Sequence, residues 1–174
     1  LEEIPAGALD DLTSFEYLYL SNNRLKKLPA GLLNNNEQIE VIYLDNNKLT
    51  ELDPGLFSNL SNLKYLSLNY NKLNSLPEGI FDNLINLKEM NLSYNPIESF
   101  PDKLLDNCSS LVRLYLENMN LTEIPAFVGN IPSLEHLYLS RNKISQIDPD
   151  IFEKLKNLCY LYLAENYITS IPEG

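Results

Sequence analysis

The sequence predicts an α/β solenoid, in which a short repeated unit coils the chain so that one strand from each repeat joins a parallel sheet. Three observations support this fold class. Leu and Asn, with 35 and 23 copies, make up one residue in three of the 174. The chain matches itself at a step of 24 residues. Hydrophobic residues alternate inside each matching segment, which is the period of a strand.

Seven segments follow the pattern L-x-x-L-x-L-x-x-N-x-L and place the predicted strands. The step between them is 24 residues except for one step of 23. Within a strand the Leu residues point to one side and the variable residues to the other, so we expect the variable residues to line a concave face. One strand cannot bury its Leu face alone, but a stack of seven forms a continuous core. The segments begin at Phe15, Ile39, Leu63, Leu87, Leu111, Leu134 and Leu158.

An Asn recurs at the turn after the strand and is interpreted as structural. Its side-chain amide can bond to backbone groups that the inward turn leaves unpaired. Met119 takes this place in the fifth repeat, where we expect an irregular turn or a bound water. The predicted ladder consists of Asn23, Asn47, Asn71, Asn95, Asn142 and Asn166.

The second half of each repeat is expected to form the convex side of the solenoid. Apolar-Pro pairs recur there, from Leu28-Pro29 to Ile171-Pro172, and apolar pairs such as Leu32-Leu33 follow them. Proline fixes φ and removes an N–H donor, so these arcs should be irregular chain or single short helical turns. Because such arcs are narrower than full helices, we expect the stack to curve gently.

The repeat and its signature resemble the leucine-rich repeat family. The resemblance covers residues 1–174 as a single domain, and a 24-residue period with Phe in the arc is similar to the extracellular class that includes Toll-like receptors and variable lymphocyte receptors. It implies a right-handed solenoid shaped as a curved horseshoe segment, with receptor or adaptor function. Members often have cysteine-bearing caps, which are not recognisable here. Leu1 aligns with Leu25 and Gly174 with Gly31, so we expect a part of a longer array or ends that a partner covers.

Composition and charge argue against several functions. One His and two Cys are too few for a structural zinc site, so we expect no metal and no cofactor. A net charge of −11 predicts that nucleic acid is not a partner. No apolar run reaches the ~18 residues that span a bilayer. Cys108 takes a core position and Cys159 a strand-surface position, so we predict no disulfide.

Nothing in the sequence indicates an active site. We find no phosphate-binding loop and no nucleophile motif, and His136 is interpreted as a surface histidine. Carboxylates such as Glu89 and Glu117 would lie on an open face that cannot raise their pKa by burial. We therefore predict that the protein is not an enzyme.

The placement of tyrosine is the strongest indication of function. Ten of the eleven Tyr residues occupy variable positions of the strand segments. Tyr offers a large, stiff and amphipathic contact area, although aromatic residues also favour strands and form cross-strand ladders. The predicted ligand-binding residues are Tyr19, Tyr43, Tyr65, Ser67, Tyr70, Glu89, Asn91, Tyr94, Arg113, Tyr115, His136, Tyr138, Tyr160 and Tyr162.

Two small residues interrupt the predicted tyrosine stripe. Ser67 and Asn91 should leave a dimple walled by Tyr43 and Tyr115, with Tyr70 and Tyr94 at its edge, and the binding site is predicted there. The acidic excess near the amino end predicts a partner with a basic patch, and ladder pairs such as Glu40 with Lys64 are expected beside it.

The function that follows is recognition of a protein or peptide. Two alternatives stay open at this point. One is a structural or adhesive segment whose ends, or whose copies, contact one another; the other is carbohydrate binding on the Tyr and Asn side chains. The structural alternative depends on the uncovered ends or on contacts between copies, and carbohydrate binding depends on the same exposed face as protein recognition.

The sequence gives mixed indications of compartment. The resemblance favours a secreted or cell-surface glycoprotein, whereas free thiols favour an intracellular protein. Four glycosylation sequons are present, close to the number that chance gives for this composition. Their asparagines are Asn59, Asn91, Asn107 and Asn120.

Overall fold

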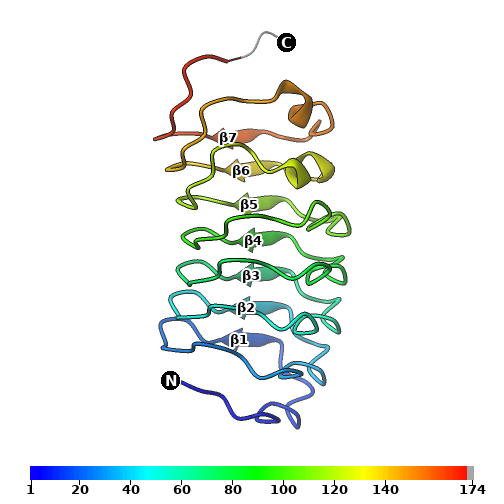
Figure 1. The fold of residues 1–174 in the computed structure, drawn as a ribbon. Helices are drawn as coiled ribbons and strands as arrows, with labels where there is room; N and C mark the ends of the chain where they lie inside the picture. The colour runs from blue at the N-terminus through cyan, green and yellow to red at the C-terminus, as the bar shows by residue number, and fades with distance from the viewer. Residues whose placement is uncertain (172–174) are drawn as a thin grey trace.

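Seven three-residue strands lie side by side in one parallel sheet, in chain order from β1 to β7 (Figure 1). The computed structural model describes residues 1–171. Pro172 and Gly174, the last residues of the predicted pattern, lie outside them. The predicted solenoid is confirmed. The strands are β1 Tyr17–Tyr19, β2 Val41–Tyr43, β3 Tyr65–Ser67, β4 Glu89–Asn91, β5 Arg113–Tyr115, β6 His136–Tyr138 and β7 Tyr160–Tyr162.

The core is built from equivalent positions of successive repeats. The middle residue of each strand from β1 to β6 is buried, because the register places it between its counterparts on both sides, as Leu66 lies between Ile42 and Met90. Leu161 of β7 is 39% exposed. Behind the sheet, the rings of Phe57 and Phe81 stack with centroids 5.9 Å apart.

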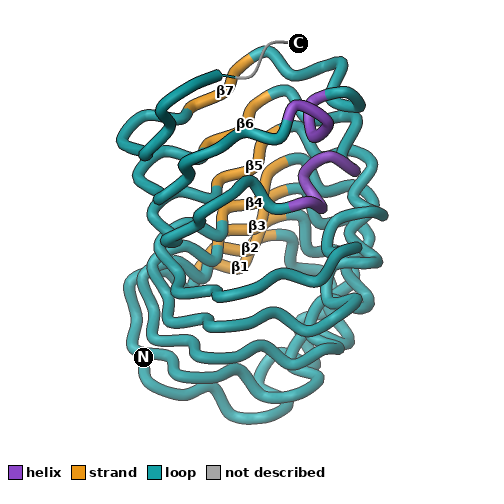
Figure 2. Tube along the Cα trace, turned by 45° about the horizontal axis from the view of Figure 1, so that its top comes forward, coloured by secondary structure: helices purple, strands orange, loops and turns teal. Residues whose placement is uncertain are grey.

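The convex side consists mostly of turns, as the prolines predict. Two arcs of the described chain form 3-10 helices, η1 at Ala126–Asn130 and η2 at Pro149–Phe152. Figure 2 shows the strands lining one face and these two helices on the opposite side. Proline begins η2 and precedes η1, which fits its fixed φ and missing N–H.

The predicted asparagine ladder joins each repeat to the one before it. The Asn47 amide donates to the carbonyl oxygens of Leu20, at 2.8 Å, and Leu44, at 3.1 Å. Its Oδ1 accepts from the N–H of Leu25 at 3.1 Å. Asn71 and Asn95 repeat the same three bonds. One side chain therefore satisfies buried backbone groups of two repeats.

Met119 interrupts this ladder. No hydrogen bond within residues 1–171 reaches the N–H of Ile97, the group that an asparagine at this position would bind. Asn142 Oδ1 instead accepts from both Met119 N–H, at 2.9 Å, and Leu121 N–H, at 3.1 Å. The turn is irregular as predicted, because Asn120 adds a second positive φ, at 60°, to the one that Asn118, at 48°, shares with the equivalent turn residues of other repeats. The bound water stays a prediction.

The burial pattern predicts different effects for two neighbouring substitutions on β5. Leu114 is fully buried, so Leu114→Ala should lower the free energy of unfolding by about 2–5 kcal/mol. Tyr115 is half-buried and stacks on Tyr138, so Tyr115→Ala should lower it by only about 1 kcal/mol. Urea unfolding followed by circular dichroism measures both. Equal losses would contradict the assignment of the two faces.

Candidate functional site

Two columns of side chains run across the concave face, because the register aligns equivalent strand positions. The third strand residues form the central column, and the first strand residues form the side column. The central column contains Tyr19, Tyr43, Ser67, Asn91, Tyr115, Tyr138 and Tyr162, and the side column contains Tyr17, Val41, Tyr65, Glu89, Arg113, His136 and Tyr160. The predicted alternation brings all strand-borne site residues onto this face.

The aromatic residues of β5 to β7 pack on one another. Tyr138 lies between Tyr115 and Tyr162, with ring centroids 4.1 and 4.4 Å away and nearly parallel planes. His136 stacks on Tyr160 at 4.4 Å in the side column. These rings therefore form a cross-strand ladder, which stabilises the sheet as well as presenting tyrosine edges to solvent.

Tyr70 and Tyr94 lie away from the strands, at the edge formed by the turns. Both have positive φ, at 54° and 59°, and their rings stack at 4.1 Å. Arg141 Nη1 donates to the Tyr94 hydroxyl at 3.3 Å. They line a shallow depression with turn residues such as Asn46 and Asn118. Their expected place at the edge of the dimple is wrong, because strand alternation ends where the left-handed turn begins.

A hollow of about 420 Å³ lies over Ser67 and Asn91, where the central column lacks rings. Both small side chains fold onto nearby polar groups. The Ser67 hydroxyl donates to the side chain of Asn69, and Asn91 Oδ1 accepts from Ser93 N–H at 3.0 Å. The space above them is left open. Tyr115 follows Asn91 in the register, but the residues that line the hollow are Ser21, Asn22, Tyr43, Asp45, Tyr65, Leu66, Ser67, Asn69, Glu89 and Asn91.

The walls of the hollow thus differ from the sequence prediction. Tyr43 lines it as expected, but Tyr65 and Asp45 replace Tyr115, Tyr70 and Tyr94. The sequence placed Tyr65 among the binding residues without this role. Asp45 was missed as a site residue. Its position two residues beyond the third residue of β2 is the signal that could have found it, because Asn69 lies at the equivalent position after β3 and also lines the hollow.

Carboxylates influence the tyrosines on both sides of the hollow. Burial raises the pKa of Tyr43, and Tyr19, Glu89, Tyr65 and Asp45 add to the rise. Burial also raises the pKa of Tyr115, with further contributions from Glu89 and from the hydrogen bond to Tyr138. A raised tyrosine pKa keeps the hydroxyl protonated and available as a donor.

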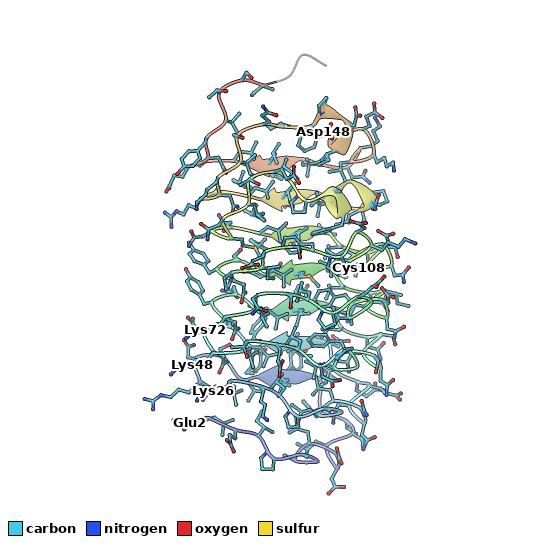
Figure 3. All side chains as sticks on the ribbon, in the orientation of Figure 1. Glu2, Lys26, Lys48, Lys72, Cys108 and Asp148 are labelled. Atoms are coloured by element: carbon cyan, nitrogen blue, oxygen red, sulfur yellow. The ribbon has the colours of Figure 1, made fainter. Side chains whose placement is uncertain are left out.

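Ion pairs also cross the face. Lys64 Nζ donates to Glu40 Oε1 at 2.6 Å, which confirms the predicted ladder pair. Arg113 Nη1 lies 3.8 Å from Glu89 Oε2. Lys26, Lys48 and Lys72 follow one another along the turn edge (Figure 3).

The remaining reactive side chains are placed apart. Cys108 is buried, as predicted, and Figure 3 shows it on the side of the arcs. Burial, with Asp82 nearby, raises the pKa of its thiol to about 12. Cys159 is exposed on the strand side. His136 Nδ1 is buried and has no hydrogen-bond partner within residues 1–171.

Within residues 1–171, no three or more His, Cys, Asp or Glu side chains lie together in a way that could hold a metal ion. In the same part of the chain, no helix is long and apolar enough to cross a bilayer.

Comparison with known families matches the leucine rich repeat model to residues 13–73, 37–97, 62–121 and 132–174. The chain belongs to the leucine-rich repeat family. No curated protein matches it.

Two solved structures share the fold over 95% of this leucine-rich repeat chain. A crystal structure of a TLR13–ssRNA13 complex aligns with a TM-score of 0.86 and 25% identity. A structure of the Toll–Spatzle complex of Drosophila aligns with a TM-score of 0.79 and 27% identity. The chain spans 24% and 25% of the length of these two proteins.

The first of these structures corrects the predicted partner classes. The expectation that nucleic acid is not a partner is wrong, because TLR13, a leucine-rich repeat protein of the same fold, forms a complex with ssRNA13. The error has a physical origin. Net charge describes the whole chain, whereas binding to a solenoid depends on the charge of the local surface that the ligand touches.

The raised pKa of Tyr115 predicts how the free energy of unfolding changes at alkaline pH. The folded state holds the Tyr115 proton more tightly than the unfolded chain, whose tyrosines titrate near pH 10. The free energy of unfolding should therefore be unaffected by this group below about pH 10 and should fall as the pH rises above it.

Tyr115→Phe removes the ionising hydroxyl and should lose less stability than the wild type above about pH 10. Urea unfolding at pH values on either side of pH 10 measures the difference. Tyr167→Phe, which is exposed and lies outside both columns, is the matched control and should retain the loss of the wild type. An identical alkaline loss in Tyr115→Phe would show that this hydroxyl does not contribute.

Proposed function

We propose that the chain is a non-enzymatic recognition module that binds a protein or peptide on its tyrosine-bearing concave face. The observation that carries this proposal is the pair of aromatic columns on an open face, with exposed rings such as Tyr19, at 62%, and Tyr160, at 52%. Exposed aromatic residues in such numbers are typical of binding surfaces. The matched structures of TLR13 and Toll are both complexes, with ssRNA13 in the first and Spatzle in the second, which supports ligand recognition as the general function.

The stacking of the rings supports a preorganised surface. Tyr138 is held between two parallel rings, so little side-chain entropy remains to be lost when a partner binds. The Arg141 contact to the Tyr94 hydroxyl holds the turn edge in the same way. A rigid aromatic face binds more tightly than a flexible one, because less free energy is lost in ordering its side chains on binding.

The proposal excludes catalysis on the concave face. His136, the one histidine of the chain, uses its ring to stack on Tyr160. The hollow is open on the concave face, and an open site does not exclude water.

Selection of peptides tests this function directly. A displayed library of random linear peptides is panned on the wild-type chain, and the binders are measured by calorimetry against Tyr43→Ala, Tyr115→Ala and Tyr167→Ala. The two concave-face variants should weaken binding about tenfold or more, because truncating a central aromatic anchor removes buried contact area. Tyr167→Ala, outside the columns, should bind as the wild type does. Melting temperatures confirm that all three variants fold.

Binders whose affinity is unchanged by the two concave-face variants would overturn the proposal. A sheet that yields no peptide binders, while the variants still destabilise the fold, would favour the structural alternative. Binding of oligosaccharides to the same tyrosines would favour carbohydrate recognition instead.

We also infer that the chain works outside the cell as a glycoprotein, on the support of its similarity to the Toll-like class. The sequons differ in their surroundings. Asn107 and Asn120 are exposed, and no hydrogen bond within residues 1–171 engages either side chain. Asn91 bonds to Ser93 N–H, and Ser93 is only 2% exposed. A glycan is attached through Nδ2, and at the half-buried Asn91 it would fill the hollow.

Expression through a eukaryotic secretory pathway should therefore give glycans at Asn107 and Asn120 and none at Asn91. Mass spectrometry of the glycopeptides measures the occupancy of each site. Thr122→Ala removes the sequon of Asn120 and should remove that glycan alone. A glycan at Asn91 in the folded, secreted protein would contradict the prediction.

A further inference from the structure

We propose that the hollow over Ser67 and Asn91 binds the guanidinium group of an arginine side chain on the partner. The inference rests on the proposed function, because it names the chemistry that the recognition face selects. Three features of the hollow carry it: carboxylate oxygens that can accept further hydrogen bonds, tyrosine rings beside an open space, and a lining in the described chain that contains no Lys or Arg.

The charged residues that line the hollow are Asp45 and Glu89, and within residues 1–171 no Lys or Arg is part of the lining. Asp45 Oδ1 accepts from the Ser21 hydroxyl at 2.6 Å, while its Oδ2 has no protein partner in the described chain. The contact of Glu89 with Arg113 is 3.8 Å long, which is beyond a hydrogen bond. Both carboxylates can therefore accept further hydrogen bonds from a cation.

The open space is bordered by aromatic residues, on whose rings a planar cation can stack. Tyr43 and Tyr65 line the hollow, and the next ring of the central column stands three strands beyond Tyr43, at Tyr115. Three strand spacings are roughly 14 Å. A planar group that stacks on a ring lies about 3.5–4 Å from it, so the gap accommodates a guanidinium with the chain that carries it.

Arginine suits this arrangement better than lysine. Its guanidinium stacks on aromatic rings and presents several N–H donors in a fixed fork, which can reach two carboxylates at once. A lysine ammonium is a compact and strongly hydrated charge that does not stack. The guanidinium can stack on the rings of Tyr43 and Tyr65. Its N–H groups can donate to Asp45 and Glu89.

Arg113 contacts the hollow only through its 3.8 Å ion pair with Glu89 Oε2, and other cations of the chain lie or bond elsewhere. Lys64 is bonded to Glu40 at 2.6 Å, and Arg141 Nε donates to Glu165 at 3.2 Å. Lys26, Lys48 and Lys72 lie along the turn edge (Figure 3). Within residues 1–171 no ion pair engages Asp45, and Glu89 can still accept hydrogen bonds from a cation that the partner supplies.

Titration with small probes tests the site. The 15N-labelled full chain is titrated with N-acetyl-arginine amide, N-acetyl-lysine amide and N-acetyl-citrulline amide, and NMR shifts at Ser67 and Asn91 are followed. The arginine probe should saturate these shifts and bind about fivefold or more tightly than the lysine probe. The neutral citrulline probe should not bind. Equal binding of arginine and lysine, or of citrulline, would overturn the inference.

Two variants change the hollow in different ways. Glu89→Gln removes one carboxylate and should weaken the arginine probe about fivefold or more. Asn91→Tyr fills the space with the residue that five other strands carry in this column, and it should abolish binding while keeping the fold. Glu98→Gln, outside the hollow, is the matched control and should bind as the wild type does. Unchanged binding in both hollow variants would place the arginine elsewhere.

The selected peptides separate this inference from the proposed function. Peptides that contain Arg, lose about tenfold affinity when Arg is replaced by Lys, and fail on Asn91→Tyr support both. Peptides that need Tyr115 but tolerate Asn91→Tyr support the recognition face and overturn the arginine site. An arginine probe that binds when no peptide does leaves the site standing and removes the proposed function. Oligouridine RNA that shifts the same amides in place of arginine overturns the inference.

Discussion

The side-chain amide of the turn asparagine connects each repeat to the one before it, and the rest of the structure depends on this connection. Asn71 bonds to the Leu68 carbonyl of its own repeat, and to the Leu44 carbonyl and Leu49 N–H of the preceding one. These backbone groups lie inside the stack, where an unpaired group is destabilising. The ladder therefore holds both the turn and the spacing of the strands, so that each Leu of the core meets its counterpart.

Register on the inside determines the surface on the outside. Because strand residues pair one to one, every outward position becomes part of a column, and a single substitution changes one place in that column. Ser67 and Asn91 produce a hollow in this way without disturbing the Leu66 and Met90 side chains beneath them, which stay buried. The scaffold thus separates stability, which comes from the inward residues, from recognition, which depends on the outward ones.

The fifth repeat shows how much irregularity the solenoid tolerates. Met119 interrupts the ladder there, and Pro96, in the fourth repeat, lacks the N–H that Lys72 of the third repeat donates to the Leu49 carbonyl. A groove of about 640 Å³ opens on this flank beside Phe100 and Met119. The sheet itself continues unbroken from β4 to β5, because strand pairing and core burial on the other side of the repeat still hold the stack together.

The sequence by itself determined the strands, the core and the ladder, because these depend on residues that recur at a constant step. Alternation placed Tyr19 and Tyr115 on the outward face, and the repeated asparagine identified Asn47 and its counterparts. The walls of the hollow came only from the tertiary structure. Asp45 reaches it and Tyr70 does not, because the backbone after each strand turns through a left-handed residue that the periodic pattern does not describe. Side-chain conformation then determines how much space is left open, as in the hydrogen bond that Ser93 N–H donates to Asn91 Oδ1. Periodic features can be read from the sequence because they recur at a constant step. The shape of the binding surface depends on contacts between residues of different repeats, which only the folded structure shows.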